Sequence, residues 1–179
     1  MSDAEPAWSV TVRLDEVPDT GRHLTIEADA ATRAALAKPL GVDAVERAAA
    51  TFDVVHQGRD GLHVSGRVMA TVRQACVVTL EPVVNEIDEA LDVDFAPQSE
   101  IQVAESEADV DGPNLPEGPE PIIGNSIDLG ALATEYLVLG VDLYPRKPGI
   151  AFDGPNVPDA PKVNPFEALS ALKKGTVKE

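Results

Sequence analysis

Alternation of apolar and polar residues is the first pattern that the chain shows. Every second residue is apolar between positions 8 and 15, and the alternation returns over residues 24–28, after a turn-forming segment at 18–21. A period of two is typical of strands that bury one face. We therefore predict that these two segments pair as a hairpin.

A helix and a second hairpin are predicted next. Asp29 is a candidate for the helix N-cap, and Pro39 and Gly41 mark the end of a segment rich in helix formers. Two β-rich segments, 51–57 and 62–78, are then separated by a glycine-bounded loop. That arrangement predicts a second, longer hairpin.

Residues 82–95 alternate again, and here the polar positions are acidic. The odd positions are mainly apolar, whereas carboxylates occupy four of the even positions, namely Glu86, Asp88, Asp92 and Asp94. A helix over 82–91 is the alternative, because three apolar residues repeat there every four positions, but it leaves the apolar residues at 93 and 95 unexplained. We predict a strand with a carboxylate face.

The second half of the chain predicts a loop and then a covering helix. Residues 97–121 are rich in proline and acidic residues and have little to bury, which indicates a mobile acidic loop. The segment 128–140 has a broad apolar face, with Ser126 or Asp128 as its cap, and predicts a helix.

A proline-rich tail, 151–179, follows and carries a short amphipathic helix over 165–174. Its apolar residues Phe166, Leu169 and Leu172 either dock back on the preceding domain or bind a partner's groove.

These elements together predict one α+β domain over residues 1–150. It consists mainly of an antiparallel β-sheet, or a partly closed barrel, built from the hairpins and covered by the helix near 128–140. No apolar run approaches the roughly 20 residues that span a bilayer, and the first residues lack the basic and apolar regions of a signal peptide. We therefore expect a cytoplasmic protein with no membrane partner.

Charge changes this picture because it is unevenly distributed. The net charge is −17, and no Lys, Arg or His occurs between Gln74 and Tyr144. A region of this kind repels phosphate backbones and attracts basic macromolecules. The acidic surface therefore either serves solubility alone or binds a basic partner. In the second case the candidate contact residues are Glu86, Asp88, Asp92 and Asp94, together with Phe166, Leu169 and Leu172 of the tail.

Direct RNA binding is the alternative, and it would use cations outside this region. The candidates are Arg59, Arg67, Arg73, Arg146, Lys147, Lys173 and Lys174. Because residues an even number of positions apart share a strand face, Arg67 and Arg73 are predicted to lie on the same side.

The sequence predicts neither catalysis nor a metal or cofactor site. A G-x-S-x-G motif, a glycine-rich phosphate loop and an H-E-x-x-H motif are all absent. If the second hairpin closes symmetrically, His56 and His63 lie opposite each other, but no third ligand with suitable spacing accompanies them. We expect Ser65 and His63 to point to opposite faces of their strand. No small-molecule substrate is expected either.

Three segments, taken in order, resemble the YceD family of large ribosomal RNA subunit accumulation proteins. They are RQACVVTLEPVVNEIDEALDVDFAP, IDLGALATEYLVLGVDLYPRKPG and NPFEALSALKK. The resemblance implies a role in the supply or assembly of the large ribosomal subunit and its RNA, with no catalytic activity assigned. The implied partner is a large-subunit ribosomal protein or pre-ribosomal RNA.

The chain departs from this family at its cysteine. Many relatives have Cys-x-x-Cys where the first segment begins, but this chain has Cys76 and then Thr79. A metal role for that pair is lost here. Cys76 is expected to be a small buried side chain at a strand end rather than a reactive thiol.

Overall fold

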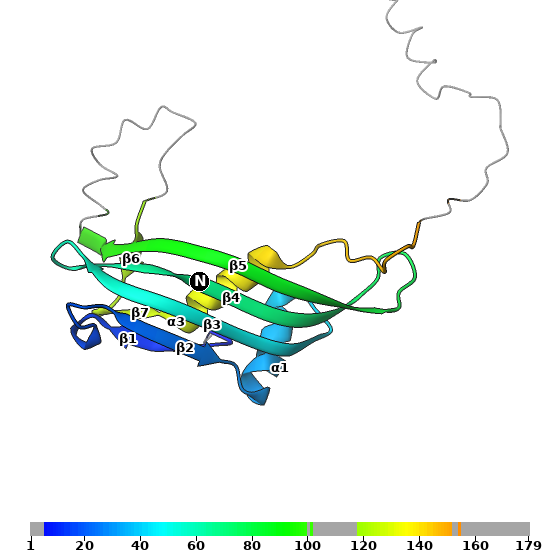
Figure 1. The fold of residues 1–179 in the computed structure, drawn as a ribbon, viewed down its shortest axis with the longest axis horizontal. Coiled ribbons are helices and arrows are strands. Elements are labelled where there is room, and N and C mark those ends of the chain that lie inside the picture. Colours follow the sequence, from blue (N-terminus) through cyan, green and yellow to red (C-terminus); the bar gives the residue numbers. More distant parts are fainter. Residues whose placement is uncertain (1–5, 100, 102–117, 152–153, 155–179) are drawn as a thin grey trace, which may run out of the picture. The chain divides into compact units, whose positions relative to one another are not determined.

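The computed structural model describes residues 6–99, 101, 118–151 and 154. The chain divides into two compact units, 1–148 and 149–179. All helices and strands named below belong to the first unit (Figure 1). In chain order they are β1 (Thr11–Arg13), the 3₁₀ helix η1 (Leu14–Glu16), β2 (Arg22–Glu27), α1 (Ala30–Leu40), β3 (Ala44–Gln57), β4 (Gly61–Ala75), β5 (Pro82–Pro97), β6 (Glu120–Ile122), β7 (Ser126–Asp128) and α3 (Leu129–Gly140).

An open five-stranded sheet forms the centre of the first unit. Its strand order is β2-β3-β4-β5-β6, with antiparallel pairing from β2 to β5 and a short parallel pairing of β6 with β5. A separate two-stranded sheet joins β1 to β7. The fold is therefore α+β with an open sheet, which is one of the two predicted forms, the other being a partly closed barrel. The barrel is not formed.

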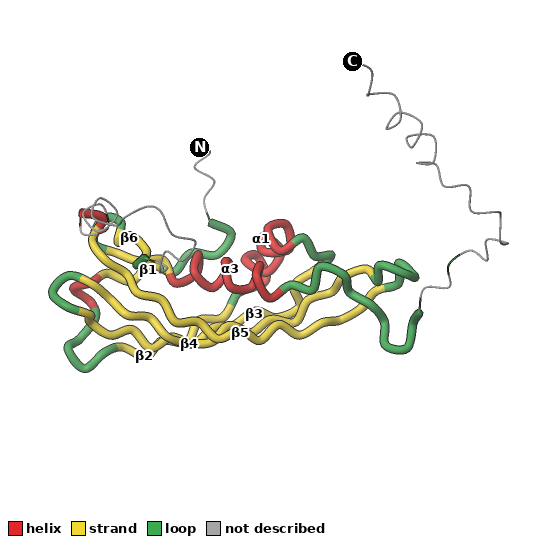
Figure 2. The backbone as a smooth tube through the Cα atoms, turned by 90° about the horizontal axis from the view of Figure 1, so that it is seen from above, coloured by secondary structure: helices red, strands yellow, loops and turns green. Residues whose placement is uncertain are grey.

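Helices α1 and α3 cover one face of this sheet, which we call the inner face (Figure 2). The side chains that point to it alternate along the strands: Phe52 of β3, Leu62 of β4 and Leu91 of β5 are all buried. Leu36 of α1 and Leu137 of α3 complete the core from the helix side. The opposite face, which we call the outer face, carries the exposed residues of β3, β4 and β5.

Asp128 connects the start of α3 to the segment before β1. Its Oδ1 accepts hydrogen bonds from the Gly130 and Ala131 amides at 2.9 and 3.1 Å, which caps the helix. The same oxygen accepts from the Val10 amide at 2.8 Å, and Oδ2 accepts from the Ser9 hydroxyl at 2.6 Å. Burial raises the pKa of Asp128, but these hydrogen bonds together outweigh it and lower that pKa. One carboxylate thus fixes both the helix start and the segment before β1.

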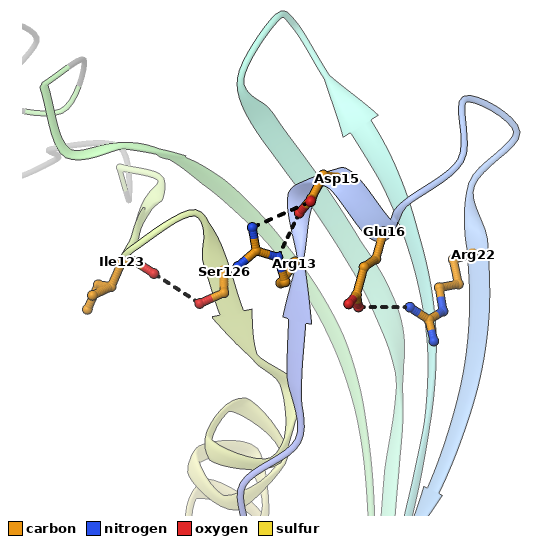
Figure 3. A network of polar contacts seen from close by, with 6 residues as sticks. All are labelled: Arg13, Asp15, Glu16, Arg22, Ile123 and Ser126. Atoms are coloured by element: carbon orange, nitrogen blue, oxygen red, sulfur yellow. Dashed lines mark hydrogen bonds and ion pairs between the residues drawn. The ribbon is translucent and has the colours of Figure 1, made fainter.

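The first predicted hairpin is wrong. β1 pairs with β7, placing Val12 opposite Ile127, whereas β2 pairs with β3. The physical reason is η1, which ends the first strand at Arg13 and turns the chain away before β2 begins. Polar contacts hold this corner: Arg13 bonds Asp15 at 2.9 Å, and Glu16 lies 3.5 Å from Arg22 (Figure 3).

The second hairpin, the first helix and the covering helix are confirmed. Asp29 caps α1 by accepting from the Thr32 amide at 2.8 Å, and Gly41 ends it with a φ of 65°. β3 and β4 form the long hairpin, and α3 lies where the covering helix was predicted. No helix among the residues the structure describes is long and apolar enough to cross a membrane.

Candidate functional site on the acidic strand

The predicted acidic strand is β5, and its four even-numbered carboxylates share one exposed face. Glu86, Asp88, Asp92 and Asp94 are all exposed, whereas Ile87 and Leu91 between them are buried. The helix alternative for this segment is thereby excluded. We call these four residues the carboxylate ladder. They lie on the outer face, on the side of the sheet opposite α3.

Side chains of β4 hold the ladder in place from the neighbouring strand. Register places Thr71 opposite Glu86, and its hydroxyl donates a hydrogen bond to Glu86 Oε2 at 2.9 Å. Arg67 lies opposite Ala90 and reaches diagonally to both carboxylate oxygens of Asp88, with Nη2 2.9 Å from Oδ2. Such cross-strand pairs are the geometry that stabilises adjacent strands. Glu86 and Asp88 therefore each have a hydrogen-bond partner on β4.

His63 contacts the other half of the ladder. Its Nδ1 lies 2.7 Å from Asp94 Oδ1, and its Nε2 lies 3.6 Å from Asp92 Oδ2. The hydrogen bond from His63 lowers the pKa of Asp94, and the one from Arg67 lowers the pKa of Asp88. Both carboxylates are consequently charged at neutral pH.

The pairing across β4 and β5 leaves a negative excess on the outer face. The ladder contributes four carboxylates, and Arg67 and Arg73 contribute two guanidinium groups on the same face of β4. Four minus two leaves two uncompensated negative charges when His63 is neutral. The prediction that the two arginines share a face is confirmed, but their charge is outnumbered.

The other predicted RNA-binding cations do not all lie at one place, and two of them are paired with carboxylates. Arg73 lies 3.6 Å from Glu46, and Lys147 lies 2.8 Å from Glu81. Arg59 is in the turn between β3 and β4, at the opposite end of that hairpin from Arg73. Arg146 follows α3 in the chain. Lys173 and Lys174 lie outside the described residues, as do Phe166, Leu169 and Leu172.

β5 also has a long side without a partner strand. It pairs with β4 along its length, but its contact with β6 covers only Phe95, Ala96 and Pro97. Among the residues that the structure describes, the stretch from Pro82 to Asp94 pairs on one side only. We call this stretch the open edge. Sequence reasoning missed it because strand order cannot be read from alternation.

A groove borders the far end of the open edge, between β5, β6 and α3. Its volume is about 810 Å³, and its lining includes Phe95, Leu132 and Tyr136 together with the carboxylates Glu120 and Glu135. Partial burial raises the pKa of Glu135, and the charge of Glu120 raises it further. Both carboxylates lie in the cation-free part of the sequence, but only the crossing of α3 over the sheet brings them together.

Cys76 is buried, as predicted, in the tight turn between β4 and β5. Its Sγ accepts a hydrogen bond from the Lys147 amide at 3.5 Å. The Thr79 hydroxyl chiefly, and then the amides of Lys147, Thr79 and Val78, lower the pKa of Cys76 to about 6, while desolvation opposes them. Thr79 thus occupies the second thiol's position as a hydrogen-bond donor, and the cysteine ties residue 147 to the turn.

Two expectations about the histidines are wrong. The hairpin closes with Gln57 opposite Gly61 around a three-residue turn, so His56 lies opposite Leu62 and His63 opposite Val55. The His56 Nε2 instead bonds the Val17 carbonyl at 2.8 Å. His63 and Ser65 share the outer face, because residues two apart on a strand point the same way. Within the described part of the chain, no group of three or more His, Cys, Asp or Glu side chains could hold a metal ion.

Fold and surface together define an α+β domain whose open sheet displays a row of exposed carboxylates beside an open strand edge. The chain belongs to the YceD family, because the model described as "Large ribosomal RNA subunit accumulation protein YceD" matches residues 64–173. The match begins in β4 and includes the carboxylate ladder and α3. No curated protein and no solved structure matches the chain.

Proposed function

We propose that this protein is a non-enzymatic cytoplasmic factor that supports accumulation of large-subunit ribosomal RNA by binding a basic large-subunit ribosomal protein. The observation that carries the proposal is the carboxylate ladder, which presents Glu86, Asp88, Asp92 and Asp94 on one exposed strand face. The description of the YceD family supports the ribosomal context.

Electrostatics favours a basic protein over RNA as the direct partner. The ladder lies in a stretch from 74 to 144 that has no basic residue, so its field attracts lysine- and arginine-rich surfaces and repels phosphates. Because Glu86, Asp88 and Asp94 already bond side chains of β4, less side-chain freedom is lost when a partner binds. A ribosomal protein held in this way would be shielded until rRNA, the more highly charged ligand, binds it in place of the carboxylates.

The absence of catalysis in the proposal follows from how the polar groups are used. Arg67, Thr71 and His63 bond to carboxylates of the neighbouring strand on an open face. Catalytic groups instead converge on a reacting atom, in a site that excludes water. The outer face therefore supports binding, and the proposal requires no small-molecule substrate and no cofactor.

Direct rRNA binding through Arg59, Arg67, Arg73, Arg146 and Lys147 is the rival. Arg67, Arg73 and Lys147 each lie beside a carboxylate, Asp88, Glu46 and Glu81 respectively. An RNA phosphate would have to displace these carboxylates and approach an acidic surface.

Two variants of equal charge test the proposal. In the ladder variant, Glu86→Gln, Asp88→Asn, Asp92→Asn and Asp94→Asn neutralise the four carboxylates without changing their shape. The control variant carries Asp19→Asn, Glu27→Gln, Asp43→Asn and Asp60→Asn, which are exposed positions outside β5. Exposed charge pairs contribute about 0.5 kcal/mol each, so four give about 2 kcal/mol, or roughly thirtyfold in affinity.

Pull-down from cell extract at low salt is the measurement. The wild type and the control variant are expected to retain basic large-subunit proteins after nuclease treatment, and the ladder variant is expected to lose them. Recovery of rRNA after the extract has been stripped of ribosomal proteins, with equal yield from all three, would contradict the proposal.

A further inference from the structure

Strand β5 has an open edge beside its carboxylate ladder, and the two features have a joint consequence. We infer that the open edge accepts an extended segment of the basic partner as an added β-strand. This rests on the function proposed above and specifies how the partner is held. Its basis is the pairing of β5 within the described residues: it meets β4 from Pro82 to Phe95 but meets β6 only from Phe95 to Pro97.

Backbone chemistry provides the first part of the argument. A strand with one paired side presents its remaining N–H and C=O groups outward, and an extended peptide satisfies them by joining the sheet. The open edge runs from Pro82 to Asp94, which is longer than the six-residue strand β2 at the opposite side of the sheet. It therefore has room for a complete added strand.

The side chains on the two faces of β5 define the sequence of the added strand. Successive residues of an added strand would alternate between the outer and the inner face. On the outer face they would meet the carboxylate ladder, which selects Lys or Arg. On the inner face they would meet the groove at the end of the open edge, where Leu132, Tyr136 and Leu139 of α3 line it together with residues 92–96 of β5.

The groove favours apolar residues at the inward positions. Leu139 is 78% exposed, so its side chain offers apolar surface that an added strand would cover. Glu135 and Glu120 lie in the same groove, so a long basic side chain with an apolar stem also fits there. The edge thus selects a segment in which cationic residues alternate with apolar ones.

A second copy of this chain is a poor occupant of the same edge. Pairing two β5 edges would bring Glu86, Asp88, Asp92 and Asp94 of one copy against those of the other. Like charges on neighbouring strands are destabilising. The charge of the edge therefore favours a basic segment over self-association.

Synthetic peptides test the inference with the full-length protein. The probe is an acetylated, amidated octapeptide of alternating lysine and valine. The first comparison is an isomer of the same composition in which lysines and valines come in pairs. The second is the alternating peptide with every other backbone nitrogen methylated, which keeps the charge and removes strand donors. We expect the alternating peptide to bind at least about tenfold more tightly than either comparison.

Hydrogen–deuterium exchange then locates the contact. The alternating peptide is expected to slow exchange of amides between Val83 and Val93, and to leave those of β2 unchanged. Equal binding of all three peptides, or slowed exchange outside β5, would overturn strand addition. Slowing that grows with protein concentration in the absence of peptide would assign the edge to a second copy and overturn it as well.

The same experiment separates this inference from the proposed function. If the three peptides bind equally, and binding still needs the ladder carboxylates, strand addition is wrong while the acidic surface keeps its role. If neither the peptides nor basic ribosomal proteins bind, both proposals fail.

Discussion

β2 lies at one margin of the five-stranded sheet, and β5 lies at the other from Pro82 to Asp94, where β6 does not reach it; the two strands differ in length and in charge. β2 has six residues and mixed chemistry: its Arg22 lies 3.5 Å from Glu16, and its His23 lies 2.7 Å from Asp53 of β3 (Figure 3 for the first pair). β5 has 16 residues and contains no cation. Natural sheets protect their edges from unwanted pairing by shortness or by charge. β2 is protected because it is short, and β5 is protected by its negative charge. A negatively charged edge still accepts a positively charged partner.

The largest effect is expected at the centre of the sheet, where β3 and β4 pair between the two edges. Gly66 of β4 leaves no space for a side chain, because an added Cβ would lie 2.1 Å from the Thr51 carbonyl oxygen of β3. Gly66→Ala must therefore push β3 and β4 apart. We expect a loss of about 3 kcal/mol in the free energy of unfolding, measured by urea denaturation.

Gly118→Ala is the control for this variant, since no atom of the described residues other than its chain neighbours lies within 4 Å of an added Cβ there. Its free energy of unfolding is expected to stay within about 0.5 kcal/mol of the wild type. An unchanged midpoint for Gly66→Ala would contradict the close packing of the central strands.

The next largest loss of stability is expected from the helices on the inner face, and it leaves both edges of the sheet unchanged. Asp128→Ala removes the cap of α3 and the bonds to Ser9 and Val10, so we expect a loss of about 2 kcal/mol. Asp29→Ala removes a single capping bond from α1 and is expected to cost less than Asp128→Ala. Below their unfolding transitions, both variants should bind basic proteins as the wild type does.

The pH dependence of the Asp128 contribution has a defined sign. The pKa of Asp128 is lower in the folded state than in the unfolded state. Its stabilisation is therefore fully present above the unfolded pKa, and it is lost as pH falls through the folded pKa. The difference in unfolding free energy between wild type and Asp128→Asn should accordingly shrink in acid. A difference that grows as pH falls would contradict the hydrogen-bonding pattern.

A smaller effect is expected from Arg67, the β4 cation that contacts the ladder. Arg67→Gln removes a positive charge and frees Asp88, so the outer face becomes more negative. Affinity for a basic ribosomal protein should rise about threefold at low salt, measured by fluorescence titration. Arg13→Gln, which removes a cation paired with Asp15 away from β5, is the control and should change nothing. A loss of rRNA binding on Arg67→Gln would favour the RNA alternative instead.

The smallest effect is expected in the groove. Partial burial and then Glu120 raise the pKa of Glu135, so its charged form is disfavoured in the folded state. Glu135→Gln should therefore raise the unfolding midpoint slightly at neutral pH. The difference should vanish as pH falls below the unfolded pKa of glutamate, because both states are then protonated. Thermal unfolding at two pH values measures it, and destabilisation at neutral pH would contradict the electrostatic origin of the shift.

Local patterns predicted most of the elements correctly. The alternation over 82–95 predicted β5 and the face of its carboxylates, and Asp29 and Gly41 predicted both ends of α1. These signals depend on residues close in sequence, whose physical meaning is the same in any fold. The alternation of the first segment was equally clear, but its partner was not. β1 pairs with β7, which lies more than a hundred residues away along the chain.

The candidate site was predicted only in part, because some of its features depend on local sequence and others on long-range pairing. Glu86, Asp88, Asp92 and Asp94 were identified from charge and period, and their common exposed face agrees with that interpretation. Their role as a partner surface stays a prediction. The contacts of Arg67 and His63 with the ladder depend on the register between β4 and β5, and the open edge depends on strand order. Neither quantity is encoded within a short stretch of sequence. The tail helix at 165–174 and most of the loop at 97–121 lie outside the described residues.

The most direct test of the acidic surface is zero-length carbodiimide cross-linking in growing cells, which joins carboxylates to lysine amines in contact. Glu81 and Lys147, 2.8 Å apart, provide an internal positive control. We expect Glu86, Asp88, Asp92 and Asp94 to become joined to lysines of large-subunit ribosomal proteins more often than Asp19, Glu27, Asp43 and Asp60. Cross-links spread equally over both sets would contradict it.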